Sequence, residues 1–132
     1  MDRLRARIGS TDEPKESVVE AGHLKAWAQA IGDRNPRWLK EAPPTFLVAL
    51  APASHHIPEA EEYGKGWLNG GNRFEYLEPV FVGDRLVAQS KLVDVYEKSG
   101  ASGSLLFLVF ESEIKNQHGR VVARLRGTGI RR

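Results

Sequence analysis

The chain has 132 residues, a formal net charge of +2 and no cysteine, with 41% hydrophobic and 27% charged residues. This length is typical of one domain with its own core, so we expect a single domain over residues 1–132. The composition excludes a disulfide framework, a thiolate nucleophile and a cysteine-based zinc site. No apolar run approaches the roughly 18 residues that cross a bilayer, and the segment Met1–Ile8 lacks the apolar stretch of a secretory signal. We therefore expect a cytoplasmic protein without membrane spans.

Basic residues are dispersed along the chain except for a group near its end: Arg120, Arg124, Arg126, Arg131 and Arg132. Such a group fits a solvated strand face, a small anionic ligand with phosphates, or nucleic acid. Charge alone does not decide among these, and we rank nucleic acid last.

Two helices are predicted in the first half of the chain, after a polar run at 10–16 that we expect to be an open loop. One face of the first helix combines four apolar residues at i, i+3, i+4 and i+7, namely Leu24, Trp27, Ala28 and Ile31. Gly32 is a natural stop for it. The run from Thr45 to Ala51 is apolar on every side and bracketed by prolines, with Thr45 as a candidate N-cap. A run this short also fits a buried strand, but we favour a central helix around which later strands wrap.

The second half of the chain has the pattern of β-strands. We predict strands over 72–81, 86–96, 105–115 and 121–128, joined by turns at 82–85, 98–103 and 116–119. The continuous apolar start of the third strand is typical of a central strand covered on both faces. In the last strand, Val121, Ala123 and Leu125 are expected to face one side, and Val122, Arg124 and Arg126 the other. This order predicts an α+β fold, with helices on one face of an antiparallel sheet and edge strands available for dimerisation.

Four segments together resemble a known family. They are 28–36 (AQAIGDRNP), 42–46 (APPTF), 79–86 with its Gly83-Asp84 pair, and 116–119 (NQHG). In this order they resemble the MaoC-like hydratases and dehydratases of the hot-dog fold, in particular their N-terminal half-domains and the mycobacterial-type non-catalytic dehydratase subunit. The resemblance spans nearly the whole chain. It implies an antiparallel sheet wrapped around a central helix, here the Thr45–Ala51 segment, and edge-to-edge pairing of two such domains.

The resemblance also implies a chemistry. Active members of the family hydrate or dehydrate trans-2-enoyl and (R)-3-hydroxyacyl thioesters of coenzyme A or acyl carrier protein, with Asp and His from a Gly-Asp-x-Asn-Pro-x-His motif. Adding water to an enoyl thioester needs a base for the water, an acid for the α-carbon and donors for the enolate-like oxygen. Asp33 and Asn35 match the motif, but its histidine position holds Trp38, which neither accepts a proton from water nor shuttles one. Half of the proton-transfer pair is therefore missing.

These observations define the candidate site. Asp33 is the catalytic candidate, while Asn35, Trp38 and the glycines Gly70 and Gly71 of a flexible loop are candidates for substrate binding. We expect no cofactor and no metal, because no two histidines have the helical spacing of a metal site.

The leading hypothesis is a hot-dog subunit of an (R)-specific enoyl hydratase or 3-hydroxyacyl dehydratase. It would bind an acyl-CoA or acyl-carrier-protein thioester while a catalytic MaoC-like subunit supplies Asp and His. One alternative is a self-sufficient homodimer that uses Asp33 with His55 or His56. Another is a hot-dog thioesterase, which typically needs a carboxylate on or beside the central helix, where 46–51 has none.

Overall fold

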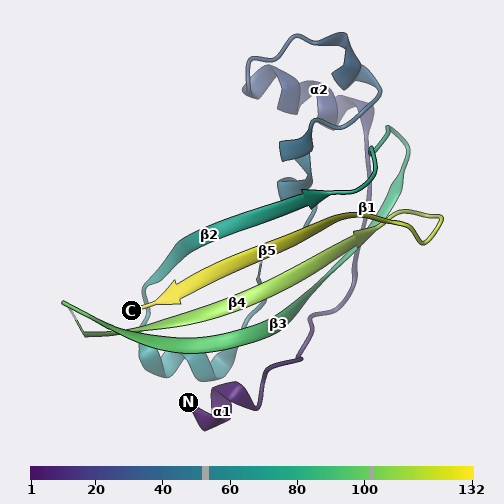
Figure 1. Cartoon of the computed structure of the whole chain (residues 1–132). Coiled ribbons are helices and arrows are strands. Elements are labelled where there is room, and N and C mark those ends of the chain that lie inside the picture. The colour runs from purple at the N-terminus through teal and green to yellow at the C-terminus, as the bar shows by residue number, and fades with distance from the viewer. Residues whose placement is uncertain (52–53, 102) are drawn as a thin grey trace.

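The main feature of the fold is a five-stranded antiparallel sheet with the order β1-β3-β4-β5-β2 (Figure 1). The computed structural model describes residues 1–51, 54–101 and 103–132. The strands are β1 (Lys15–Val18), β2 (Trp67–Tyr76), β3 (Arg85–Gly100), β4 (Gly103–Lys115) and β5 (Val121–Arg131). β1 and β2 therefore form the two edges, and the long strand β4 lies at the centre.

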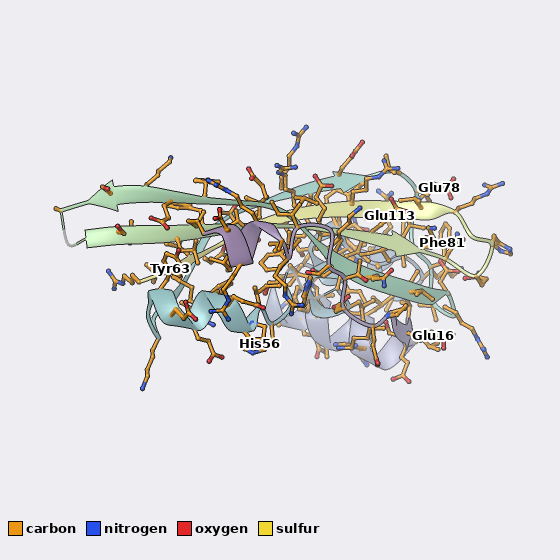
Figure 2. The ribbon with its side chains drawn as sticks, turned by 90° about the horizontal axis from the view of Figure 1, so that it is seen from below. Glu16, His56, Tyr63, Glu78, Phe81 and Glu113 are labelled. Carbon is orange, nitrogen blue, oxygen red and sulfur yellow. The ribbon has the colours of Figure 1, made fainter. Side chains whose placement is uncertain are left out.

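Helical segments cover one face of this sheet. Two are α-helices, α1 (Asp2–Arg5) and α2 (Ala21–Ala30), and three are 3-10 helices, η1 (Pro36–Leu39), η2 (Pro44–Ala49) and η3 (Pro58–Tyr63). α2 and η3 lie on the same side of the sheet at opposite ends of it (Figure 2). The predicted α+β architecture is confirmed. None of the helices in the described ranges combines the length and the apolar character needed to span a bilayer.

The central segment is the 3-10 helix η2, so the α-helix predicted over Thr45–Ala51 is wrong in type. Pro43 occupies its N-cap position and no side chain caps it. Thr45 has another role, because its hydroxyl accepts a hydrogen bond from the indole N–H of Trp27 at 3.2 Å. Phe46 is buried, but Val48 is 49% exposed. The tight turn of a short 3-10 helix thus leaves one side open, and the expectation that this segment is covered all round is wrong.

The first helix follows the prediction over most of its length. In α2, Leu24 is buried and Trp27 is half-buried. Ile31, expected on the same face, is instead 49% exposed. The reason is that α2 ends at Ala30, with Ile31 as its C-cap, and Gly32 takes a φ of +69° that terminates the helix as predicted.

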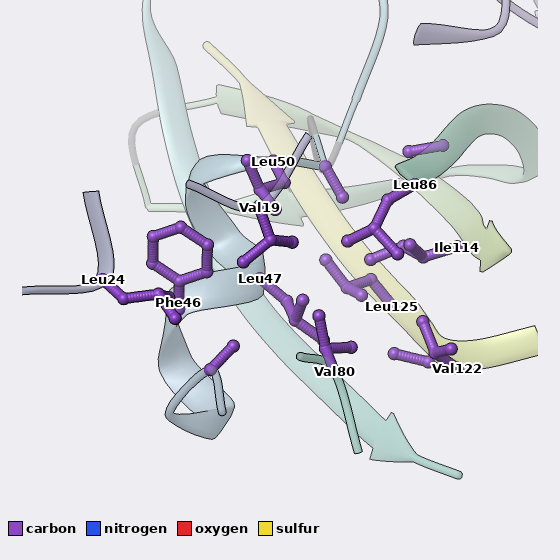
Figure 3. Close-up of a cluster of buried hydrophobic side chains, with 14 residues drawn as sticks. Val19, Leu24, Phe46, Leu47, Leu50, Val80, Leu86, Ile114, Val122 and Leu125 are labelled. Carbon is purple, nitrogen blue, oxygen red and sulfur yellow. The ribbon is translucent and has the colours of Figure 1, made fainter. Parts of the chain in front are cut away.

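The core consists of two apolar clusters at opposite ends of the sheet. The cluster near η2 and α2 includes the fully buried side chain of Phe46 (Figure 3). The ring of Phe46 meets those of His23 and Trp27 edge-on at centroid distances of 4.8 and 5.8 Å. The cluster near η3 comprises Leu4, Ile57, Ala60, Leu92, Val95, Leu106, Leu108 and Phe110. Ser90 and Ser112 are buried at paired positions of β3 and β4, between the two clusters. The core is therefore divided by polar side chains.

The run at 10–16, predicted as an open loop, is held along β3. Thr11 forms an isolated bridge with Lys91, and the carboxylate of Asp12 accepts a hydrogen bond from the backbone N–H of Ser90 at 2.7 Å. The prediction is wrong because the backbone of β3 offers hydrogen-bond partners to this run. The local composition of the run does not reveal such a tertiary contact.

The glycine-rich edge strand β2 lies five residues earlier than the strand predicted over 72–81. After Tyr76 the chain leaves the sheet, because the N–H groups of Leu77 and Glu78 both donate to the carbonyl of Val122, at 2.9 and 3.2 Å. Pro79 has no N–H to continue the ladder. Phe81 consequently forms only an isolated bridge with Glu41.

The other strands and turns follow the predictions with local differences. The turns at 82–85 and 116–119 are confirmed. The hairpin predicted at 98–103 is narrower, since β3 continues to Gly100 and β4 starts at Gly103, and residue 102 lies outside the described residues. Predicted alternation in the last strand is wrong at its start: the register shifts at Lys115, and Val122 and Ala123 are both fully buried. A β-bulge of this kind places consecutive side chains on one side.

Candidate functional site

Two consecutive side-chain turns position the candidate site after α2. The Oδ1 atom of Asp33 accepts a hydrogen bond from the backbone N–H of Asn35 at 2.9 Å. Oδ1 of Asn35 in turn accepts one from the N–H of Arg37 at 3.0 Å, which caps η1. Asp and Asn before proline are well suited to such turns. Both motif residues thus build the loop that carries Trp38.

Trp38 is half-buried and is held on one side by an ion pair. The guanidinium of Arg37 lies 5.5 Å from the centroid of the indole ring and is bound to both carboxylate oxygens of Glu41, at 2.9 and 3.0 Å. The indole Nε1 of Trp38 is buried and has no hydrogen-bond acceptor in regular geometry among the described residues. The residue in the histidine position is therefore a fixed donor with no ability to accept a proton.

The charge state of Asp33 follows from these neighbours. The N–H of Asn35, and secondly the nearby indole N–H of Trp38, hold the pKa of the Asp33 carboxyl below its usual value. The contribution of the indole is the smaller of the two, and its N–H makes no regular hydrogen bond among the described residues. A general base works best with a pKa near the operating pH. Asp33 is instead ionised at neutral pH, without an imidazole beside it.

Trp38 lines two cavities. The first, of about 540 Å³, is lined by the polar side chains of Lys25, Gln29, Asp33, Arg34 and Asn35 together with apolar residues that include Ala28, Pro36 and Leu39. The second, of about 420 Å³, has a mixed lining that combines apolar side chains, among them Pro43, Pro44, Leu47, Tyr76, Leu77 and Val80, with the charged side chains of Arg37, Glu41 and Glu78. The indole thus lies between the cavity that contains Asp33 and a second cavity of mixed polar and apolar lining.

Gly70 and Gly71 are placed away from Asp33. They belong to the edge strand β2 rather than to the flexible loop that we expected, and a register shift occurs between Asn69 and Gly71. Gly71 has a φ of +144°, and a Cβ at Gly70 would lie 3.0 Å from Cδ1 of Ile130. Gly71 therefore accommodates a β-bulge, and Gly70 allows a close packing contact. Neither lines the two cavities beside Trp38.

His55 and His56, considered as partners for Asp33, line a separate cavity of about 210 Å³. The Nδ1 atom of His55 lies 3.1 Å from Oγ of Ser90, and its Nε2 lies 3.5 Å from Oγ of Ser10. Burial is the main cause that lowers the pKa of His55. His56 lies toward the Tyr63 end of the molecule in Figure 2. One chain therefore does not bring either histidine to the Asp33 loop.

Several residues of these cavities were not identified from the sequence. Lys25 and Arg34 lie in ordinary polar surroundings along the chain, and Tyr76 and Leu77 lie where a strand ends, so no local pattern distinguishes them. Within the three described ranges, no group of three or more His, Asp or Glu side chains is arranged to hold a metal ion.

Solved structures similar to this one define its class. The ChsH1-ChsH2 complex from Mycobacterium tuberculosis matches with a TM-score of 0.81 and 16% identity, over 98% of this chain and 88% of that chain. A HadBC (3R-hydroxyacyl-ACP dehydratase) complex from the same organism matches with a TM-score of 0.75 and 21% identity, over 94% and 96%. R-hydratase PhaJ1 from Pseudomonas aeruginosa matches with a TM-score of 0.71 and 20% identity, over 96% and 83%. The chain has the α+β hot-dog fold of the MaoC-like dehydratases.

Sequence comparison gives the family within this class. The model of the FAS1-like dehydratase domain region matches residues 6–125. A UPF0336 protein of Parafrankia sp. is 31% identical over 117 residues, which cover 76% of this chain and 75% of that protein. The chain belongs to the FAS1-like dehydratase-domain family, and the resemblance to MaoC-like hydratases and dehydratases seen in its motifs is confirmed.

Proposed function

We propose that this chain is the substrate-binding subunit of an (R)-specific enoyl hydratase or 3-hydroxyacyl dehydratase. A second MaoC-like chain supplies the catalytic Asp and His, and the substrate is a thioester of coenzyme A or acyl carrier protein. The proposed location is the cytoplasm, since a chain without cysteine has no need of an oxidising compartment.

The observation that carries the proposal is the pair formed by Asp33 and Trp38. The carboxylate is held in its ionised form by two N–H groups, and the side chain in the histidine position offers only a donor. Proton transfer to the α-carbon and from water needs two groups that exchange protons. The pair of Asp33 and Trp38 therefore supports a role in substrate binding rather than in proton transfer.

A partner strand has a suitable surface on β2. This edge strand is exposed over most of its ten residues, whereas the opposite edge strand, β1, has only four. Large apolar side chains are exposed on and just after β2: Trp67, Leu68, Tyr76, Leu77 and Phe81. An unpaired edge with apolar side chains favours pairing with another strand. The similarity to two structures of complexes agrees with this arrangement.

The cavity of about 420 Å³ beside Trp38 is the proposed site for the acyl chain, along the apolar part of its lining formed by residues such as Pro43, Leu47 and Val80. Its walls come from the start of η2 and from the segment after β2, with the indole at one end. Aromatic and proline side chains provide rigid apolar walls at a small cost in conformational entropy. Because Tyr76 ends the edge strand β2, a partner paired there would lie next to this cavity.

The test is to purify the chain alone and together with a partner that carries an intact Gly-Asp-x-Asn-Pro-x-His motif, and to measure crotonyl-CoA hydration. We expect activity only in the complex. Asp33→Ala in this chain should leave the rate within about threefold, whereas replacing the motif aspartate of the partner should lower it by about 10²-fold or more. Full activity of the isolated chain would contradict the proposal.

The two alternatives have weaker support. A homodimeric hydratase would need His55 or His56 near Asp33, but these histidines line another cavity. A thioesterase would typically need a carboxylate near the central helix, and η2 contains only Pro, Thr, Phe, Leu, Val and Ala. Release of free thiol from an acyl thioester distinguishes this second alternative from hydration.

A further inference from the structure

Arg131 is a charged residue at a strand position that faces the helix-covered side of the sheet. It pairs with Leu106 of β4 on one side and with Trp67 of β2 on the other. Leu106 is fully buried in the apolar cluster near η3. Paired residues of neighbouring strands project to the same face, so Arg131 points toward this cluster. A guanidinium in such a position requires a partner, because burial of an unpaired charge is unfavourable.

The guanidinium of Arg131 lies against an aromatic ring, that of Trp67, but makes few hydrogen bonds. We call this ring the platform of the guanidinium. The guanidinium lies 5.0 Å from the centroid of the Trp67 ring. Its Nη1 donates to the carbonyl of Lys65 at a long 3.5 Å, and its Nε is buried without a partner among the described residues. No ion pair within the described ranges includes Arg131. The donors of this side chain are therefore largely unused.

The Trp67 platform is fixed by the backbone of β5. A Cβ atom at Gly129 would lie 2.0 Å from Cζ2 of Trp67, so the ring occupies the space that any other residue would fill. The Trp67 ring covers one face of the guanidinium. The N–H groups of Arg131 lie in the plane of the guanidinium, so the ring does not block them.

Arg131 lines the cavity of about 210 Å³ described above. Its lining includes Ser54, His55, His56, Trp67, Leu108 and Arg131. Both ring nitrogens of His55 are engaged with serine hydroxyls, so His55 forms a wall. Nε2 of His56 lies 3.4 Å from Oε1 of Glu61, a residue outside the cavity lining. The cavity thus combines a guanidinium, an imidazole and a hydroxyl over an apolar floor.

We propose that this cavity binds a small oxyanion, a carboxylate or a phosphate group, whose oxygens accept hydrogen bonds from the guanidinium of Arg131. Two adjacent oxygens of such a group match the planar donors of arginine. The volume corresponds to about seven water molecules, which is enough for a carboxylate or inorganic phosphate. This site is at the opposite end of the sheet from the Asp33 loop, and it does not depend on the proposed subunit function.

The test is a titration of the full chain with acetate and with inorganic phosphate at constant ionic strength, with chloride as the reference anion. Binding is followed by the indole N–H signal of Trp67 and the Nε–H signal of Arg131 in ¹H–¹⁵N spectra. Thermal unfolding gives a second readout, with a rise in Tm of roughly 5 °C at about ten times the Kd. Binding of acetate alone assigns a carboxylate ligand, binding of phosphate alone a phosphate ester, and binding of both an oxyanion of either kind.

Arg131→Gln and Arg131→Lys are the test variants, and Arg126→Gln is the matched control. Arg126 is on the same strand but pairs with Glu111 on the other face of the sheet. We expect Arg131→Gln to weaken binding about tenfold or more, Arg131→Lys to weaken it less, and Arg126→Gln to leave it unchanged. The absence of a saturable shift in the wild-type spectra would overturn the proposal. Equal binding by Arg131→Gln would do the same.

Discussion

The Gly129→Ala substitution tests the contact on which the Arg131 cavity depends. The added methyl group would lie 2.0 Å from Cζ2 and 2.1 Å from Cη2 of Trp67. Real carbon atoms do not approach so closely, so the indole ring has to leave the surface of β5. Its departure removes the platform under the guanidinium of Arg131.

The cost is estimated from the covered part of the ring. Trp67 is 42% exposed, so a little more than half of its surface is covered. A fully covered aromatic side chain buries about 200 Å². Losing this contact at about 25 cal/mol per Å² lowers the free energy of unfolding by at most roughly 3 kcal/mol, and overpacking costs of about 1–3 kcal/mol agree with that limit. For a domain of this size, the Tm should fall by roughly 5–15 °C.

The assay is thermal unfolding combined with tryptophan emission, and the control is Gly22→Ala. A Cβ at Gly22 meets nothing within 4 Å, so this change in α2 should leave the Tm unchanged or raise it slightly. We expect Gly129→Ala to unfold earlier and to shift the emission of Trp67 to the red. The double variant Gly129→Ala/Trp67→Leu should lose less than the sum of the single variants, because the clash is absent. A Gly129→Ala protein with unchanged Tm and emission would refute the reasoning.

Three further predictions concern the core, the buried histidine and the candidate site. Phe46→Ala should lower the free energy of unfolding in urea by about 3–5 kcal/mol, because the large side chain of Phe46 is fully buried in its cluster. Burial lowers the pKa of His55, so the unfolded chain takes up a proton at higher pH than the folded one. Stability should therefore be complete above about pH 6.5 and decline as the pH falls below it, less steeply in His55→Asn. Trp38→His should raise crotonyl-CoA hydration by the isolated chain by about tenfold or more, since it returns a proton-exchanging group beside Asp33; an unchanged rate would show that further groups are missing.

Strong periodicity and turn chemistry were sufficient to predict much of the fold. β4 and the turn at Gly83 follow from side-chain patterns that tertiary packing does not alter. The stop of α2 at Gly32 has the same local cause. The bounds of β2 were not predicted correctly, because they depend on tertiary packing. β2 begins with a glycine-rich sequence, which forms a strand by pairing with β5. The burial of Val122 depends on a bulge, which alternation alone does not show.

The candidate site was predictable in part. The loop of Asp33, Asn35 and Trp38 lies together as the motif indicates, because adjacent residues in one turn cannot separate. Gly70 and Gly71 lie in the edge strand β2, away from this loop. Their assignment to a flexible loop rested on local sequence alone, which does not show strand pairing. The sequence marks Arg131 only as one of five arginines near the end of the chain and does not distinguish it from the others, because an arginine near the end of a strand usually points to solvent.

The serines that divide the core also affect how mutations combine. Ser90 and Ser112 separate the cluster around Phe46 from the cluster around Leu106. Packing defects are transmitted through direct contacts, so effects within one cluster should be non-additive while effects in different clusters should add. The Asp33 end of the sheet and the Arg131 end can then accumulate substitutions separately. Such a division allows the pocket at one end to diverge in evolution while the other end keeps its packing.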